Sequence, residues 1–118
     1  MKSHSEYSDQ EFLKAFQDCT LAEELFNHEA HLRLAWLQVT NGVEALAIQN
    51  VTVLLLKYTK HLGASDIFNL ELTVAAVKLV AKLNSLDTYE TFESFMNRNP
   101  RLMNDFKGLL KEHYQLDL

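Results

Sequence analysis

Apolar residues recur along most of this chain at intervals of three and four positions. This spacing is typical of one face of an α-helix, whereas a half-buried strand would alternate with a period of two. The chain has only three glycines and one proline in 118 residues, so it contains few helix breakers. The pattern therefore predicts an all-α fold, a compact single-domain bundle of about five to six helices joined by short loops.

Capping residues set the expected helix bounds. Ser8 with Glu11 three positions later forms a capping box, and Asn27 is a good N-cap for the segment after it. Gly42 and Gly63 each follow an apolar segment and are expected to end it as left-handed C-terminal stops. The expected helices cover 8–19, 28–40, 43–62, 65–82, 88–97 and 99–114, with a single turn at 21–26. The other expected caps are Thr20 with Glu23, Ser65 or Asp66, Asp87 with Glu90, and Asn99 with Pro100.

Length, net charge and cysteine content limit the number of domains and the kinds of partner that this chain can have. Residues 1–118 are long enough for one domain, with residues 1–7, including His4, expected as a flexible tail. A net charge of -5 and the lack of a basic stripe argue against nucleic acid as a partner. No apolar run approaches the roughly 20 residues that span a bilayer, and no signal peptide is apparent, so we expect no membrane partner. A single cysteine cannot form an internal disulfide, so we expect a protein of the reducing cytoplasm. The single cysteine, Cys19, is expected to pack in the core.

The segment "FNHEAHLRLAW", residues 26–36, carries the most informative polar pattern. On a helical wheel, His28 points the same way as Leu32 and Ala35, with Trp36 and His31 at the two margins of this face. Both imidazoles are therefore expected to face inward, where each needs hydrogen-bond partners. The opposite arc, which includes Glu29 and Arg33, is expected to face water, where these two would form an i,i+4 ion pair.

A second helix is expected to place polar side chains near the two histidines. Glu71, Lys78 and Lys82 form its exposed stripe, which leaves Asn69 and Thr73 on the inward arc. We therefore expect a small polar cavity shared by His28, His31, Asn69 and Thr73, with Trp36 at its edge.

The sequence alone does not decide which chemistry this cavity supports. Two histidines at i,i+3 can reach one ion, but a zinc site needs at least three protein ligands and the sequence offers no clear third beside His28 and His31. A nucleophilic triad also lacks an acid and a Gly-x-Ser-x-Gly elbow. Two hydrogen-bonded core histidines, a small-ligand pocket and a metal site are the alternatives. We expect no metal and no cofactor.

The same residues resemble a family of small uncharacterised bacterial all-helical proteins. Its members carry Phe-x-His-x-x-His-x-x-x-x-Trp, then a glycine, then Tyr-His-Glu-Thr-x-Thr. Here "FNHEAHLRLAW" resembles the first motif, Gly63 the glycine, and "FNLELT" (68–73) the second. "NPRL" (99–102) and "LLKEHYQLDL" (109–118) resemble the later Asn-Pro-x-Leu and Leu-Leu-x-x-Tyr-Tyr blocks.

The second family motif is degenerate in this chain. Asn69 stands where the family has histidine and Leu70 where it has glutamate, while Thr73 matches. The resemblance implies a metal or proton-transfer site in fuller members, of which this chain keeps His28 and His31. An amide in place of imidazole and leucine in place of carboxylate remove acid/base groups.

Two functions follow from these residues. The favoured expectation is a non-catalytic binding or interaction module with a residual polar cavity, which takes a small ligand or associates with itself. The alternative is a metal-dependent or general-base enzyme that uses His28 and His31.

Overall fold

The computed structural model describes residues 3–114, and within that range the chain forms seven α-helices, three short 3-10 turns and no strand. The predicted all-α single-domain bundle is confirmed, with slightly more helices than expected. The α-helices are α1 (Asp9–Gln17), α2 (His28–Thr40), α3 (Glu44–His61), α4 (Leu70–Ser85), α5 (Phe92–Arg98), α6 (Arg101–Asn104) and α7 (Phe106–Tyr114). The 3-10 turns are η1 (His4–Glu6), η2 (Glu23–Leu25) and η3 (Ser65–Ile67).

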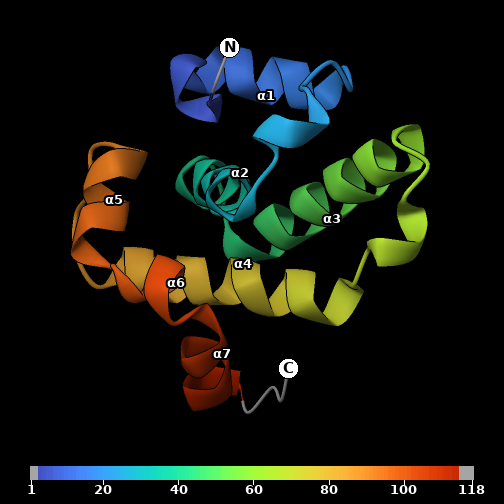
Figure 1. Ribbon diagram of the computed structural model, residues 1–118. Coiled ribbons are helices and arrows are strands. Elements are labelled where there is room, and N and C mark those ends of the chain that lie inside the picture. The colour runs from blue at the N-terminus through green and yellow to red at the C-terminus, as the bar shows by residue number, and fades with distance from the viewer. Residues whose placement is uncertain (1–2, 115–118) are drawn as a thin grey trace.

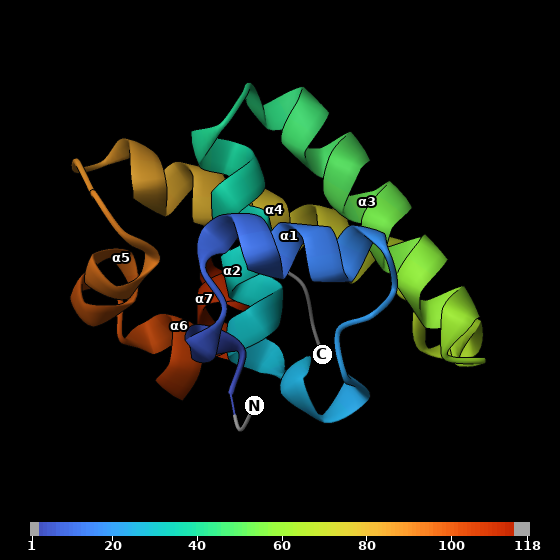
Figure 2. The ribbon, with the colours of Figure 1, turned by 90° about the horizontal axis from the view of Figure 1, so that it is seen from above.

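Helix α2 lies at the centre of the bundle. Figure 1 shows it nearly end-on, with α1 on one side, α4 on the other and α3 beside it. Seen from above, α1 crosses over α2, and α5 to α7 lie on the side away from α3 (Figure 2). The most extensive contacts between elements join α2, α3 and α4 to one another.

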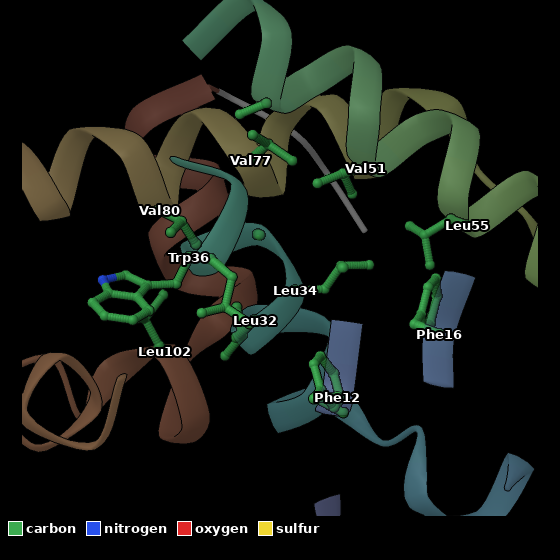
Figure 3. Packing of buried hydrophobic residues seen from close by; sticks show 14 of the residues in the cluster. Phe12, Phe16, Leu32, Leu34, Trp36, Val51, Leu55, Val77, Val80 and Leu102 are labelled. Carbon is green, nitrogen blue, oxygen red and sulfur yellow. The ribbon is translucent and has the colours of Figure 1, made fainter. Parts of the chain in front are cut away.

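A central helix must bury more than one face, and the sequence of α2 is apolar over most of its circumference. Leu32, Leu34 and Trp36 are all buried, and Figure 3 shows them pointing toward different neighbours. Each buried aliphatic or aromatic side chain contributes about 1.5–3 kcal/mol through the hydrophobic effect. Leu79 and Val80 of α4 are fully buried in the same core.

Several predicted caps are confirmed. Ser8 accepts from the backbone N–H of Glu11 at 3.1 Å, and the Glu11 carboxylate accepts from the Ser8 N–H at 2.9 Å. The Asn27 side chain accepts from the N–H of Ala30 at 2.9 Å, as an N-cap should. Gly63 has φ of +71° and ends α3 as predicted.

The prediction of a left-handed stop at Gly42 is wrong, because Gly63 is the glycine with positive φ among residues 3–114. Helix α2 ends through side chains instead: the amide of Asn41 donates to the carbonyl of Leu37 at 2.7 Å. The left-handed position after α1 is taken by Cys19, with φ of 59°. Cys19 is half-buried against the core, so its predicted contact with apolar residues is found at the core's edge.

The second half of the chain departs from the predicted bounds in three places. The expected helix over 65–82 begins later, at Leu70, after the turn η3. The cap of α5 is Thr91 paired with Ser94, rather than Asp87 with Glu90. The expected helix over 99–114 is broken at Asp105, whose φ of -152° and ψ of 48° lie outside the helical region.

Residues 3–7 pack against the domain rather than forming a tail, and residues 1–2 of the expected tail lie outside the described part. His4 is 1% exposed, as buried as the core leucines. No helix within residues 3–114 combines the length and the apolar character that a membrane span requires.

Candidate functional site

A pocket of about 280 Å³ opens between α2, α3, the start of α4 and the first residue of α7. The expected polar residues His28, His31, Asn69 and Thr73 all line it, so the structure brings together the two faces that the sequence pattern paired. The wall is nevertheless mostly apolar. Its remaining residues are Glu23, Phe26, Leu32, Ala35, Val51, Leu55, Tyr58, Thr59, Leu62, Ile67, Phe68, Leu72, Ala76, Val77 and Phe106.

His28, the first residue of α2, is half-buried and has a defined partner. Its Nε2–H donates to the backbone carbonyl of Leu102 at 2.8 Å, because a carbonyl oxygen can only accept. The ring also packs edge-to-face on Phe106, with centroids 4.7 Å apart. Its partner is thus a backbone carbonyl and not the amide of Asn69 that the sequence suggested.

His31 lies one turn further along α2, at the pocket wall. The residue as a whole is exposed at the surface, so the expected burial is wrong for His31, but its side chain lines the pocket as the inward-facing prediction requires. It packs edge-to-face on Phe26, with centroids 4.1 Å apart. The pocket walls displace water around the ring, and this desolvation, together with the nearby His28, lowers the pKa of His31 to about 4. Near neutral pH the ring is therefore uncharged and offers one donor and one acceptor to the pocket.

Asn69 and Thr73 lie at the start of α4, where their polar groups serve the helix. The Asn69 side chain accepts from the N–H of Leu72 at 3.0 Å, which makes it the N-cap. The Thr73 hydroxyl donates to the carbonyl of Asn69 at 2.8 Å. Both residues border the pocket, but their principal hydrogen bonds stabilise the helix end rather than the histidines.

Trp36 does not line the pocket. Its indole N–H donates to the side-chain carbonyl of Asn84 at 3.0 Å, and its ring lies near those of Phe92 and Phe95. The sequence placed Trp36 at the margin of the histidine face. The structure instead turns it toward α5 and the end of α4, where it is 4% exposed.

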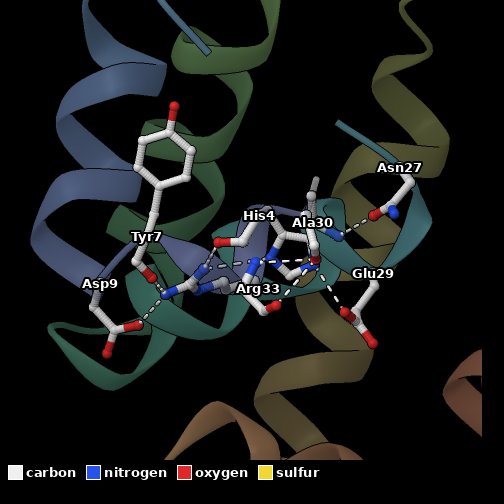
Figure 4. A network of polar contacts seen from close by, with 9 residues as sticks. His4, Tyr7, Asp9, Asn27, Glu29, Ala30 and Arg33 are labelled. Carbon is white, nitrogen blue, oxygen red and sulfur yellow. Dashed lines mark hydrogen bonds and ion pairs between the residues drawn. The ribbon is translucent and has the colours of Figure 1, made fainter. Parts of the chain in front are cut away.

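Sequence reasoning missed a buried polar network around Arg33, which Figure 4 shows in detail. The guanidinium donates to the carbonyls of His4 and Tyr7 at 2.7 and 2.8 Å and to the Asp9 carboxylate at 2.9 Å. His4 accepts from Arg33 at Nδ1 and donates from Nε2 to Glu29 at 2.8 Å. Arg33 is 6% exposed, so its predicted exposure to water is wrong, and so is the expected Glu29–Arg33 pair.

This network borders a second groove, which includes residues of α5 such as Phe92 and Met96. Its charged groups are already paired with one another, and Arg33 also lies 4.6 Å from the centre of the Phe12 ring. The arrangement anchors the N-terminal segment to α2. We therefore read it as structural and place the candidate site in the first pocket.

Within residues 3–114, no group of three or more His, Cys, Asp or Glu side chains is placed to hold a metal ion. His61 is exposed on the last turn of α3 and does not line the pocket with His28 and His31. No family model matches the chain, and neither a curated protein nor a solved structure matches it.

Proposed function

We propose that this protein is a non-catalytic binding module whose pocket between α2, α3 and α4 takes a small, mostly apolar ligand that ends in a hydrogen-bonding group. The observation that carries the proposal is the pairing of an apolar wall with an uncharged imidazole, His31, for which residues 3–114 supply no hydrogen-bond partner. Ligand pockets commonly combine such walls with a few polar groups that orient the ligand.

The size of the pocket suits a small molecule. An apolar cavity of about 150 Å³ in another protein binds benzene. The present cavity, at 280 Å³, is roughly twice that volume and has room for a chain of several carbons or a bicyclic body. Val51, Leu55 and Val77, labelled in Figure 3, form part of the inner wall.

Catalysis is less well supported by the same geometry. An imidazole whose pKa is near 4 is a weaker base than one poised near neutral pH, which is where a general base works best. His28 uses its N–H on the Leu102 carbonyl, and neither ring contacts a carboxylate that would orient it. The alternative of an enzyme using His28 and His31 therefore remains the second choice.

The resemblance to small bacterial helical proteins fits this proposal. The chain keeps His28 and His31 but has Asn69 and Leu70 where the second motif has acid/base residues. Self-association and a cytoplasmic location stay predictions.

The test is calorimetric titration with linear alkanols from butanol to octanol. Each added methylene should tighten the dissociation constant by about fourfold, from about 0.8 kcal/mol per buried CH₂, until the cavity is filled. Ala76 lines the pocket, so Ala76→Phe should fill it and abolish binding.

Ala45→Phe is the matched control, because Ala45 is exposed on α3 and does not line the pocket. It should bind alkanols as the wild type does. Alkanols that fail to bind, or that bind both variants equally, would contradict the proposal.

A further inference from the structure

The charges around the pocket have one sign. Glu23 is the only carboxylate of the wall within the described residues, and neither lysine nor arginine lines it there. His31 does not add a positive charge there, because its pKa is lowered to about 4. The wall therefore presents a carboxylate, and no lysine or arginine, to an incoming ligand.

Glu23 is close enough to act electrostatically on the inner wall. Its carboxylate contributes, after burial, to raising the pKa of Tyr58 to about 12. Tyr58 is fully buried at the base of the pocket, with its hydroxyl donating to the Leu21 carbonyl at 2.7 Å. The field that disfavours a phenolate at this site favours a positive charge nearby.

Aromatic rings supply a second attraction for a cation. Phe26, Tyr58, Phe68 and Phe106 all line the pocket. The first, second and fourth contact other rings, whereas Phe68 is half-buried and has no ring partner among the described residues. An aromatic ring in a cavity wall is a surface on which an ammonium group gains cation–π energy.

One feature opposes a cation, namely the positive end of the α4 dipole at the pocket rim. It is weakened in two ways. The Asn69 side chain occupies the N–H of Leu72, and Glu71 places a carboxylate in the first turn. The whole chain also carries a net charge of -5, which attracts cations from solution.

We propose that the ligand is an organic cation, a primary or quaternary ammonium with a compact apolar body, whose charged end lies between Glu23 and the ring of Phe68. The apolar body occupies the cavity beside Val51, Leu55 and Val77. This proposal rests on the binding function proposed above and adds the charge of the ligand to it.

The test compares three probes with the same six-carbon chain at pH 7 and low ionic strength: hexylamine, hexanol and hexanoate. They are cationic, neutral and anionic respectively. Hexylamine should bind about three- to thirtyfold more tightly than hexanol, the range that a cation–π contact with partial desolvation gives, and hexanoate should bind most weakly.

Two variants test whether the preference for hexylamine over hexanol depends on Glu23 and Phe68. Glu23→Gln and Phe68→Leu should each weaken hexylamine by severalfold and leave hexanol within twofold of the wild type, on the order expected for one exposed charge pair or one ring contact. Glu90→Gln is the matched control, because Glu90 is an exposed acid outside the pocket. It should change neither affinity.

The outcomes separate the two proposals. Hexanol or hexanoate binding as tightly as hexylamine would overturn the cation proposal and leave the binding function standing. Equal loss of hexylamine affinity in Glu23→Gln and Glu90→Gln would also overturn it, because the effect would then be one of net charge. Failure of all three probes to bind would overturn both.

Discussion

The imidazole of His28 donates to the backbone carbonyl of Leu102 across 2.8 Å, which links the first residue of α2 to α6, 74 positions further along the chain. Leu102 itself is fully buried. This bond holds α6 against the first residue of α2, and Phe106, the first residue of α7, lines the pocket together with His28. Asn69 faces the same pocket, but its hydrogen bond goes to the N–H of Leu72.

The separate partners of His28 and Asn69 predict independent effects on stability. His28→Leu should lower the free energy of unfolding by about 1–3 kcal/mol, because the Leu102 carbonyl loses its donor. Asn69→Ala should cost about 1 kcal/mol through loss of the N-cap. Urea unfolding of both single variants and the double variant should show additivity within about 0.5 kcal/mol. A larger coupling energy would mean that the two side chains interact directly.

The buried guanidinium of Arg33 should be essential for holding residues 3–7 in place. Arg33→Ala removes four hydrogen bonds, two of them to backbone carbonyls, and leaves Asp9 without its partner. We expect a loss of about 2–4 kcal/mol in the free energy of unfolding and faster amide exchange in residues 3–7.

Arg101→Ala is the control for this change, because Arg101 also binds two carboxylates but lies exposed on the surface. Its removal should cost far less, since exposed ion pairs contribute little. Equal destabilisation by the two variants, or unchanged exchange in residues 3–7 of Arg33→Ala, would contradict the anchoring role.

Acid should destabilise the protein through His31. The pKa of His31 in the folded chain is about 4, below the value of about 6.5 for a histidine in an unfolded chain. As the pH falls between these values, the unfolded chain binds the proton first. The stability contributed by neutral His31 is therefore fully present above about pH 6.5 and is lost as the pH falls through about 4.

Urea unfolding between pH 7 and pH 4 measures this effect. His31→Gln, which cannot titrate, should lose less stability over that window than the wild type does. Parallel curves for the two proteins would show that the His31 ring is as free in the folded chain as in the unfolded one, contrary to its position in the pocket wall.

Two glycines at helix ends give a matched test of backbone conformation. A Cβ at either Gly42 or Gly63 would meet no atom within 4 Å, so neither alanine substitution creates a steric clash with a neighbouring residue. Gly63 has φ of +71° and Gly42 does not have positive φ. Gly63→Ala should therefore lower the free energy of unfolding by about 1 kcal/mol. Gly42→Ala should leave the free energy of unfolding unchanged or raise it slightly. The reverse order would contradict the helix ends described here.

Local signals in the sequence were sufficient for α2 and α3, but not for the start of α4, which also carries part of the site. The bounds of α2 follow from Asn27 and from the apolar spacing after it, because a cap and its helix are neighbours along the chain. The same spacing brought His28 and His31 to the face opposite Asn69, and the structure places these three residues around one pocket.

Long-range partners were the part that the sequence could not provide. Arg33 looks solvent-facing on a helical wheel, but His4 and Tyr7, 26 to 29 positions earlier in the chain, fold over it. The partner of His28 is a backbone carbonyl, and backbone carbonyls carry no residue-specific signal. The mostly apolar wall of the pocket likewise depends on how α3 packs against α2 and α4, which no single-helix pattern contains.

The most direct test of the central claim is an NMR experiment that locates a small amphiphile on the protein with methyl groups labelled. Addition of hexylamine should shift the methyl resonances of Val51, Leu55 and Val77 and give intermolecular nuclear Overhauser effects to them, because these residues line the pocket. The exposed Val53, on the same helix as Val51 and outside the pocket, should be unaffected. Contacts confined to Val53 and other exposed residues, or none at all, would contradict the claim that this pocket is the binding site.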